Sequence, residues 1–155
     1  MTQSHAEDVL TYEDSEEAHA AAEAKAAAEA KAKAVIEAAI RKELKKPTGE
    51  LTDADLEKVR VPVLGGTKIT DMGLKEAAKL QKLTILYLGS TKVTKAGLKE
   101  VAKLERLERL YLGSTKITDA GLKDVAKLQK LGELYLFGTK TTDAGLKEVA
   151  KLQKL

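Results

Sequence analysis

The chain has 155 residues, of which 43% are apolar and 33% are charged, and its formal net charge is +3. This length leaves room for one hydrophobic core, and the balance of apolar and charged residues is typical of a folded domain. The absence of cysteine excludes disulfides, thiolate catalysis and cysteine-ligated zinc, and it favours a reducing, cytoplasmic location.

The first segment, residues 1–17, is acidic, with six Asp or Glu residues and no Lys or Arg. It has no basic start followed by an apolar core, so we expect no secretory signal. No part of the chain has an apolar run long enough for us to expect a membrane partner. Because the segment has too little apolar surface to fold alone, we predict a disordered acidic tail. The alternative is that this tail folds onto the basic repeats described below.

Residues 18–46 are rich in alanine and are predicted to form a helix on propensity alone. Large apolar side chains occur in the second half, where Val35, Ile36, Ile40 and Leu44 form one stripe. We therefore expect the second half to cap the domain that follows and the first half to project or fray. A coiled-coil arm is the alternative, although sustained heptads are missing.

Residues 47–66 are predicted to contain an N-terminal cap and a first strand. Pro47 ends the preceding helix, and the segment from Thr52 to Asp55 resembles a capping box that starts a short helix. The residues after Val59 follow the strand pattern of the repeats, except that Pro62 stands at a buried position. Because proline lacks the backbone donor of a ladder, we predict that this strand is the outermost one of the sheet.

Residues 67–155 consist of one sequence written nearly four times, with a period of 24 residues. The first copy reads TKITDMGLKEAAKLQKLTILYLGS, and the third reads TKITDAGLKDVAKLQKLGELYLFG. The complete copies are residues 67–90, 91–114 and 115–138, and a partial copy covers residues 139–155. This period is typical of solenoid repeats, in which each copy needs its neighbours to cover its apolar side.

Each copy changes its hydrophobic period once, and this change separates two predicted elements. In the first half, apolar residues such as Leu98 and Val101 follow the spacing of an amphipathic helix. In the second half, the alternation of Leu110, Tyr111 and Leu112 indicates a strand whose leucines are buried and whose tyrosine faces outward. Because a helix separates successive strands, we expect a parallel sheet with right-handed crossovers.

The spacing of these leucines resembles the leucine-rich repeat pattern L-x-x-L-x-L-x-x-N-x-L, which can be read here from Leu107 to Ile117. The Thr-Asp-Ala-Gly-Leu start of the copies is similar to the helical-type repeats of many bacterial proteins and of F-box-type proteins. The segment around Thr52 is similar to the N-terminal caps of bacterial, internalin-like members. The resemblance implies an α/β fold: a right-handed solenoid with a parallel sheet on its concave face, helices on its convex face and an N-terminal helical cap. It also implies protein interaction.

Two departures from this pattern concern the packing of the repeats. The chain contains no Asn, so threonine stands at the ladder position, where it offers one hydroxyl instead of an amide. The last copy has Thr141 at the position of Ile69, Val93 and Ile117. We therefore expect the last copy to be the least well packed and to fray.

The predicted binding surface lies on the outward face of the sheet. Tyr87, Tyr111 and Tyr135 occupy equivalent positions, about 4.8 Å apart from strand to strand. Tyrosine and arginine are enriched among binding hot spots, so we predict that a protein or peptide partner binds there. The alternative is that a ladder of rings only stabilises the sheet. The predicted ligand-binding residues are Tyr87, Tyr111, Tyr135, Arg109, Glu133, Ile85 and Phe137.

Other patterns argue against catalysis and against nucleic acid. Lysines recur on the predicted helices together with Glu or Asp, so this face mixes both signs and is not expected to bind nucleic acid. His5 and His19 have no further ligands nearby in sequence, so we expect no metal and no cofactor. Acidic residues recur as surface ladders rather than as a unique pair, so we predict that the chain is not an enzyme. One row of lysines near the strand ends remains worth testing against polyanions: Lys68, Lys92, Lys116 and Lys140.

The last copy stops where its next strand would begin, because Leu155 is equivalent to Leu131. We expect four apolar side chains to be half covered beside an unpaired strand edge, namely Leu134, Leu136, Leu146 and Val149. The main hypothesis is a non-catalytic scaffold that binds a protein or peptide. The alternative is an assembly piece, or a fragment of a larger repeat protein, that associates with itself through this C-terminal edge or through the N-terminal helix.

Overall fold

The computed structural model describes the backbone of residues 4–155 and the side chains of residues 15–155. The chain divides into two compact units, Met1–Lys31 and Ala32–Leu155. Helix α1 (Ser4–Leu44) continues across the boundary between them. Among the described residues, no helix combines the length and the hydrophobicity that a bilayer crossing requires.

Helix α1 begins earlier than the sequence predicts. We expected a disordered tail over residues 1–17, but the helix starts at Ser4, and residues 1–3 lie outside the described part of the chain. The physical reason is that extending an existing helix costs little, and acidic side chains are favoured near its amino end. From Ser15 to Lys31, all side chains are exposed.

The last third of α1 belongs to the second unit and contributes to its core. Ala32, Ile36 and Ile40 are buried, and Val35 and Leu44 pack against the same core. Apart from Ala32, these are the residues of the predicted stripe. The helix ends at Leu44, two residues before the predicted end at residue 46.

The link from α1 to the repeats contains one short helix and an extended segment. Helix α2 (Asp53–Leu56) starts with the predicted capping box, formed by Thr52 and Asp55. The predicted first strand is reduced to an isolated bridge between Val63 and Tyr87. It lies outermost as expected, but Pro62 has no N–H to donate and a continuous ladder does not form.

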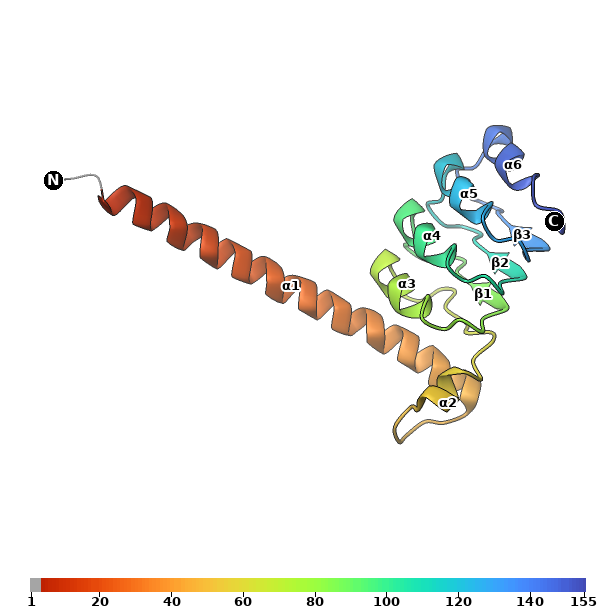
Figure 1. Cartoon of the computed structure of the whole chain (residues 1–155), viewed down its shortest axis with the longest axis horizontal. Coiled ribbons are helices and arrows are strands. Elements are labelled where there is room, and N and C mark those ends of the chain that lie inside the picture. Colours follow the sequence, from red (N-terminus) through yellow and green to blue (C-terminus); the bar gives the residue numbers. More distant parts are fainter. Residues whose placement is uncertain (1–3) are drawn as a thin grey trace. The chain divides into compact units, whose positions relative to one another are not determined.

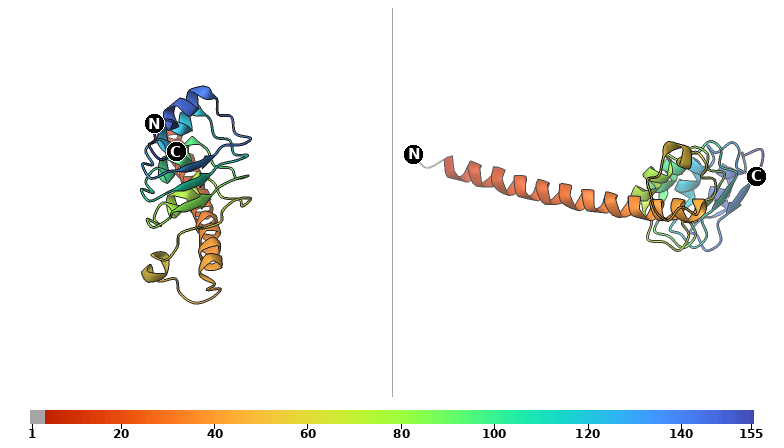
Figure 2. Two further views of the ribbon diagram at one scale, coloured as in Figure 1. Left: turned by 90° about the vertical axis from the view of Figure 1, so that its right-hand side faces the viewer. Right: turned by 90° about the horizontal axis from the view of Figure 1, so that it is seen from below.

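The repeats form two layers, one of helices and one of strands, as Figures 1 and 2 show. The strands are parallel in the order β1-β2-β3, and their register aligns Leu86 with Leu110 and Leu110 with Leu134. Helices and strands alternate along the chain as α3 (Asp71–Ala77), β1 (Ile85–Tyr87), α4 (Lys95–Val101), β2 (Arg109–Tyr111), α5 (Asp119–Val125), β3 (Glu133–Tyr135) and α6 (Asp143–Val149). The core lies between the layers and is filled by the leucines that the sequence predicts to face inward.

The ladder threonines bond to the carbonyl three residues before them, just after the preceding strand. The hydroxyl of Thr91 donates to the carbonyl of Leu88 over 2.6 Å, and Thr115 makes the same bond to Leu112 over 2.6 Å. Both threonines are buried. A single hydroxyl therefore closes the turn after the strand. In the last copy, the hydroxyls of Thr139 and Thr141 lie 2.8 Å apart.

A carboxylate clamp joins two pairs of neighbouring helices. Asp71 accepts the backbone N–H of Thr94 (2.7 Å) and its hydroxyl (2.6 Å), and Asp119 accepts the same two groups from Thr142 (2.6 Å each). These hydrogen bonds, first that from the Thr142 side chain, lower the pKa of Asp119 below its usual value. Between α4 and α5 the clamp is missing, because Lys95 stands at the position of the aspartate.

The C-terminal end of the repeats is covered less than the interior. Leu146 is 46% exposed, whereas its equivalents Leu98 and Leu122 are fully buried. Leu134 and Leu136 are partly buried, as predicted. The prediction was wrong for Val149, which is only 2% exposed. Its side chain belongs to the core of the described repeats, whereas Leu146 stands at the position that covers a following copy.

Candidate functional site

The three strand tyrosines form a continuous stack on the outward face of the sheet, which we call the tyrosine column. The ring centroids of Tyr87 and Tyr111 lie 4.4 Å apart with 19° between the ring planes. Those of Tyr111 and Tyr135 lie 4.3 Å apart with 10° between the planes. The column follows from the strand register, because the leucines on both sides of each tyrosine face the core and turn its ring outward.

The rings differ in exposure along the column. Tyr87 and Tyr111 are half-buried, and this burial raises the pKa of both phenols. They therefore stay protonated at neutral pH and can donate hydrogen bonds. Tyr135 is 48% exposed, because only one face of its ring is stacked on a neighbour among the described residues. The column thus has one open end, at β3.

The charged residues of the predicted binding surface, Arg109 and Glu133, lie in the row of side chains beside the tyrosine column. The Arg109 Nε lies 3.1 Å from the Glu133 Oε1, and the Tyr135 hydroxyl donates to Glu133 Oε2 over 3.4 Å. Ile85 belongs to the same row and is half-buried. An exposed ion pair of this kind contributes little to stability, about 0–1 kcal/mol, so both side chains can turn to a partner at small cost.

Phe137 is the most exposed large apolar residue in the described part of the chain, at 90%. The equivalent residues of the other copies are glycines. A Cβ at Gly89 would lie 3.3 Å from the carbonyl oxygen of Gly113, and a Cβ at Gly113 would lie 3.2 Å from that of Phe137. Interior copies therefore need glycine at this position for close stacking. Phe137 belongs to the third copy, beyond whose strand no further strand is described, and its phenyl ring is exposed.

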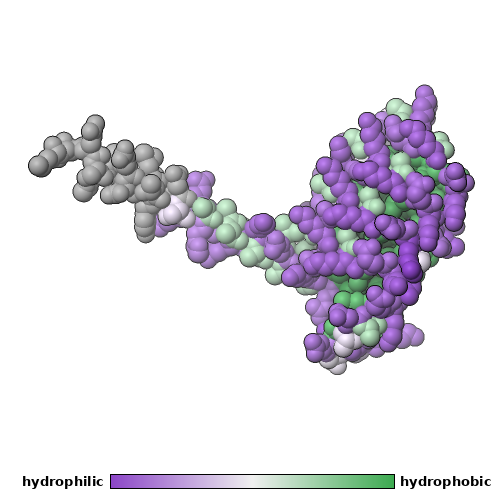
Figure 3. Space-filling model, in the orientation of Figure 1, coloured by the Kyte–Doolittle hydropathy of each residue, from purple (hydrophilic) through white to green (hydrophobic). Residues whose placement is uncertain are grey.

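The helix face carries paired charges, and Figure 3 shows it as rows of polar residues with apolar residues between them. Lysine and acidic residues three positions apart form ion pairs, such as Lys103 with Glu100 at 2.6 Å and Lys127 with Asp124 at 2.8 Å. The predicted mixture of signs on this face is therefore present. The row of Lys68, Lys92, Lys116 and Lys140 is exposed and forms no ion pair with the described residues.

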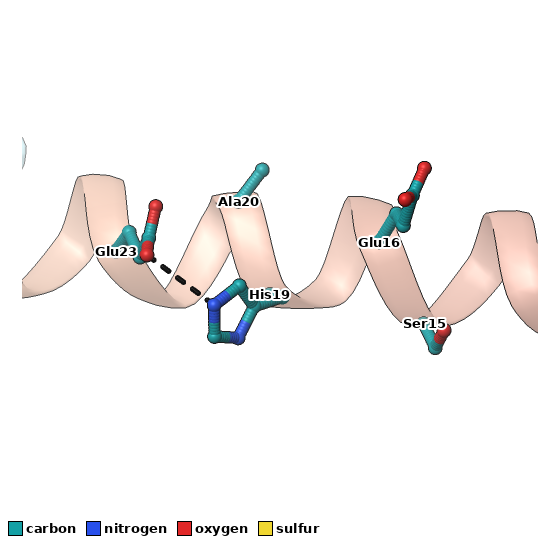
Figure 4. A pocket seen from close by; sticks show the side chains of 5 residues that line it. All are labelled: Ser15, Glu16, His19, Ala20 and Glu23. Atoms are coloured by element: carbon teal, nitrogen blue, oxygen red, sulfur yellow. Dashed lines mark ion pairs between the residues drawn. The ribbon is translucent and has the colours of Figure 1, made fainter.

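The surface around His19 on α1 is shallow, and all of its lining residues come from one helix (Figure 4). The His19 Nε2 lies 3.3 Å from Glu23 Oε1, and both side chains are well exposed. Within the described residues, no group of three or more His, Cys, Asp or Glu side chains could hold a metal ion. The side chain of His5 lies outside the described residues.

The repeated unit also matches a known family. Residues 106–126 fit the family model of the leucine rich repeat. This stretch of the chain is therefore a leucine-rich repeat. No curated protein matches it significantly.

Solved structures with similar folds include two internalins of Listeria monocytogenes and a plant receptor. The first internalin is 21% identical over 64% of this chain and 35% of its own, with a TM-score of 0.43. Internalin C2 is 20% identical over 76% of this chain and 70% of its own, with a TM-score of 0.39. The plant peptide hormone receptor RGFR1, in complex with RGF2, is 17% identical over 68% of this chain and 18% of its own, with a TM-score of 0.42. This chain thus spans about a third of the first of these proteins.

Sequence reasoning missed two features of the structure. The clamp aspartates had a sequence signal, because Thr-Asp pairs recur at the start of three copies and Thr-Lys replaces them in one. The second feature is Glu43, whose Oε1 accepts the backbone N–H groups of Arg60 (2.7 Å) and Val61 (3.0 Å). Glu43 lies in α1 outside the repeated sequence, so no periodic signal could reveal it.

Proposed function

We propose that this leucine-rich repeat protein is a non-catalytic scaffold that binds a protein or an extended peptide on the outward face of its sheet. Leucine-rich repeat proteins generally serve in protein–protein binding, which supports this class of function. The observation that carries the proposal is the tyrosine column, three stacked rings on the outward face of the sheet with the ion pair of Arg109 and Glu133 beside it. Aromatic rings with polar neighbours offer large contact area at low entropic cost.

The proposed geometry is a right-handed solenoid with this sheet on its concave side. Parallel strands lie about 4.8 Å apart, whereas packed helices need about 8–10 Å. Each copy contributes one strand and one helix, so the helix layer is longer than the strand layer. The array therefore curves, with the strands on its inner side. A right-handed path is the one that twisted parallel strands favour when helices connect them.

The test of the binding face is a triple substitution of Tyr87, Tyr111 and Tyr135 to Ser. Peptides selected on the unmodified chain from a displayed random library should lose at least about tenfold in affinity, since each aromatic contact contributes at hot-spot level. Circular dichroism should show the same helix content in both proteins. The matched control replaces Lys75, Lys99 and Lys123 by Ser on the helix face of the same copies. Equal affinity of the tyrosine variant and the unmodified chain would refute the proposed face.

We also propose that the last third of α1 acts as an N-terminal cap, with residues 47–66 completing it. The support is the position of Glu43. In the repeats, the carbonyl of Thr84 accepts the N–H groups of Glu108 and Arg109, and the carbonyl of Arg60 accepts those of Thr84 and Ile85. The Glu43 carboxylate takes the equivalent place before the first copy.

The cap predicts a specific loss of stability. Replacing Glu43 by Ala removes the acceptor of two backbone N–H groups and should lower the free energy of unfolding by about 1 kcal/mol, since water can reach these groups. Replacing Glu43 by Gln keeps one acceptor oxygen and should restore most of the loss. Urea unfolding followed by circular dichroism measures both. If the Gln variant loses as much free energy of unfolding as the Ala variant, the hydrogen bonds that Glu43 accepts do not stabilise the N-terminal end of the repeats.

A second candidate function is assembly through the C-terminal edge or through the N-terminal helix. The exposure of Leu146 and Phe137 at this edge favours it, because apolar groups of this size are usually covered. Sedimentation at two protein concentrations decides the question. A single monomeric species at both concentrations would count against assembly.

A further inference from the structure

The turns that lead from the sheet to the helices carry charge of a single sign. Four equivalent turns cover residues 64–70, 88–94, 112–118 and 136–142. They contain four lysines and no Asp or Glu. The lysines occupy equivalent positions and are exposed, and we call them the lysine row: Lys68, Lys92, Lys116 and Lys140.

The four turns share one hydrogen-bonded conformation, which fixes the spacing of the lysine row. In each turn, the hydroxyl of a threonine donates to the carbonyl three residues earlier over 2.6–2.7 Å. One residue of each turn has a positive φ: Gly66 (69°), Ser90 (56°), Ser114 (57°) and Gly138 (69°). In the first three turns, the N–H of this residue donates to a carbonyl of the next turn over 2.8–2.9 Å. The lysines therefore follow one another at about the 4.8 Å spacing of parallel strands.

The carboxylates nearest to the lysine row in sequence are engaged elsewhere. Three residues after each lysine, the helix begins with Asp71, Lys95, Asp119 or Asp143. Asp71 and Asp119 each accept the backbone N–H and the hydroxyl of a threonine in the next copy. Their oxygens are thus held toward the next helix. In the second copy, Lys95 adds a fifth cation instead of a carboxylate.

Lysines on the helix face, in contrast, have acidic partners. Four of them lie 2.6–3.0 Å from a carboxylate oxygen three positions earlier: Lys79, Lys103, Lys127 and Lys151. The hydrogen bond and the charge of Lys151, and more weakly the charge of Lys123, lower the pKa of Glu148. The lysine row forms no such ion pair with the described residues. Its members repel one another, because they lie closer together than the screening length of about 10 Å.

We infer that the lysine row binds an extended acidic segment of a protein partner, whose carboxylates lie along the four turns. Three steps of about 4.8 Å give a row about 14 Å long, which about five residues of extended peptide span. Lysine side chains are flexible, so each ammonium group can reach a carboxylate without an exact match of spacing. The inference goes beyond the proposed function and stands without the tyrosine column, because the row lies on the turns.

Two other polyanions fit the lysine row less well. Single-stranded nucleic acid binds through bases that stack on free aromatic faces, whereas the tyrosine rings are stacked on one another at 4.3–4.4 Å. A basic patch holds a membrane stably only together with an apolar anchor. In three of the four turns, the three residues before the lysine are all Gly, Ser or Thr. A protein partner on the outward face of the sheet, in contrast, can continue onto these turns.

The test uses fluorescein-labelled octaglutamate and fluorescence anisotropy with the full chain. The ionic strength is about 0.1 M, at which exposed charges more than about 10 Å apart are largely screened. Replacing the lysine row by Gln should weaken binding at least about tenfold, since four exposed ion pairs of about twofold each multiply. The matched control changes the net charge equally and should stay within about twofold, by replacing with Gln the helix-face residues Lys75, Lys99, Lys123 and Lys147.

The outcomes separate this inference from its alternatives. Equal losses in the two lysine variants would show that net charge alone holds the peptide, and so would overturn the inference. Octaglutamate that does not bind the unmodified chain overturns it as well. Octathymidylate, or vesicles of phosphatidylserine and phosphatidylcholine, could bind more tightly than octaglutamate and lose binding in the lysine-row variant. That result would assign the row to nucleic acid or to a membrane and likewise overturn the inference.

The tyrosine column provides the control for independence from the proposed function. The triple substitution of Tyr87, Tyr111 and Tyr135 to Ser should leave the binding of octaglutamate within about twofold, because this substitution changes no charge at neutral pH. Circular dichroism should show the same helix content in all variants. A loss of octaglutamate binding in the tyrosine variant would place the acidic peptide on the sheet and overturn binding at the turns, while the proposed function would stand.

Discussion

Replacing Leu98 by Ala is expected to lower the free energy of unfolding by about 2–5 kcal/mol, the range for a fully buried leucine. Leu98 is fully buried in α4, and its Cδ1 would lie only 2.9 Å from a Cβ placed at Gly121 of the next copy. Truncation therefore leaves a cavity at the interface between the two copies and weakens the packing of both. Urea unfolding followed by circular dichroism measures the loss from the shift in midpoint at unchanged slope.

Leu146 is the matched control for Leu98, because it occupies the same position of the repeat in α6. It is 46% exposed, since none of the described residues follows it as a further copy. Replacing Leu146 by Ala should cost less than about 1.5 kcal/mol, because roughly half of the side chain is already in contact with water. Equal losses at the two positions would contradict the view that burial between copies holds the array together.

Replacing Gly97 by Ala is expected to lower the free energy of unfolding by about 1–3 kcal/mol, as for other overpacked sites. Helix propensity alone would make alanine about 1 kcal/mol more stable than glycine here. We expect a net loss of stability because the contacts of the added Cβ with the neighbouring copy outweigh this gain. An added Cβ would press on Asp71 Oδ1 and would lie 2.7 Å from the Cδ1 of Leu74. The carboxylate would then have to leave its hydrogen bonds with Thr94.

Gly132 provides the control for Gly97. A Cβ there would lie 3.4 Å from the nearest carbonyl oxygen, an ordinary contact, so Gly132→Ala should stay within about 0.5 kcal/mol of the unmodified chain. A double-mutant cycle sharpens the test. In the background of Asp71→Ala, the cost of Gly97→Ala should shrink, because one of the colliding groups is gone. If the losses of stability from the two substitutions are fully additive, contact with the Asp71 carboxylate is not the reason that glycine is needed at position 97.

Local patterns predicted the elements of the repeats well. The alternation around Leu110 and Tyr111 predicted short parallel strands, and the aligned register and stacked rings confirm it. The capping box at Thr52 was found where expected. These features depend on neighbours within a few residues, so the sequence carries their signal directly.

The errors concern residues whose state depends on distant parts of the chain. The predicted strand before Ile69 is reduced to one isolated bridge, because Pro62 has no N–H to donate to the ladder. Val149 is buried rather than half covered, because the packing of the repeats buries this position even in the last helix. The start of α1 at Ser4 reflects cooperative extension of a helix, which composition alone does not measure.

The sequence by itself determined the period of 24 residues, the order of helix and strand in each copy, and the outward direction of the tyrosines. Hydrophobic period and strand alternation are properties of consecutive residues, so they can be read without coordinates. The tertiary structure decided which groups distant in sequence meet, such as Asp71 with Thr94 and Glu43 with Arg60. These pairings depend on the offset between stacked copies, and that offset arises only when their apolar faces pack together.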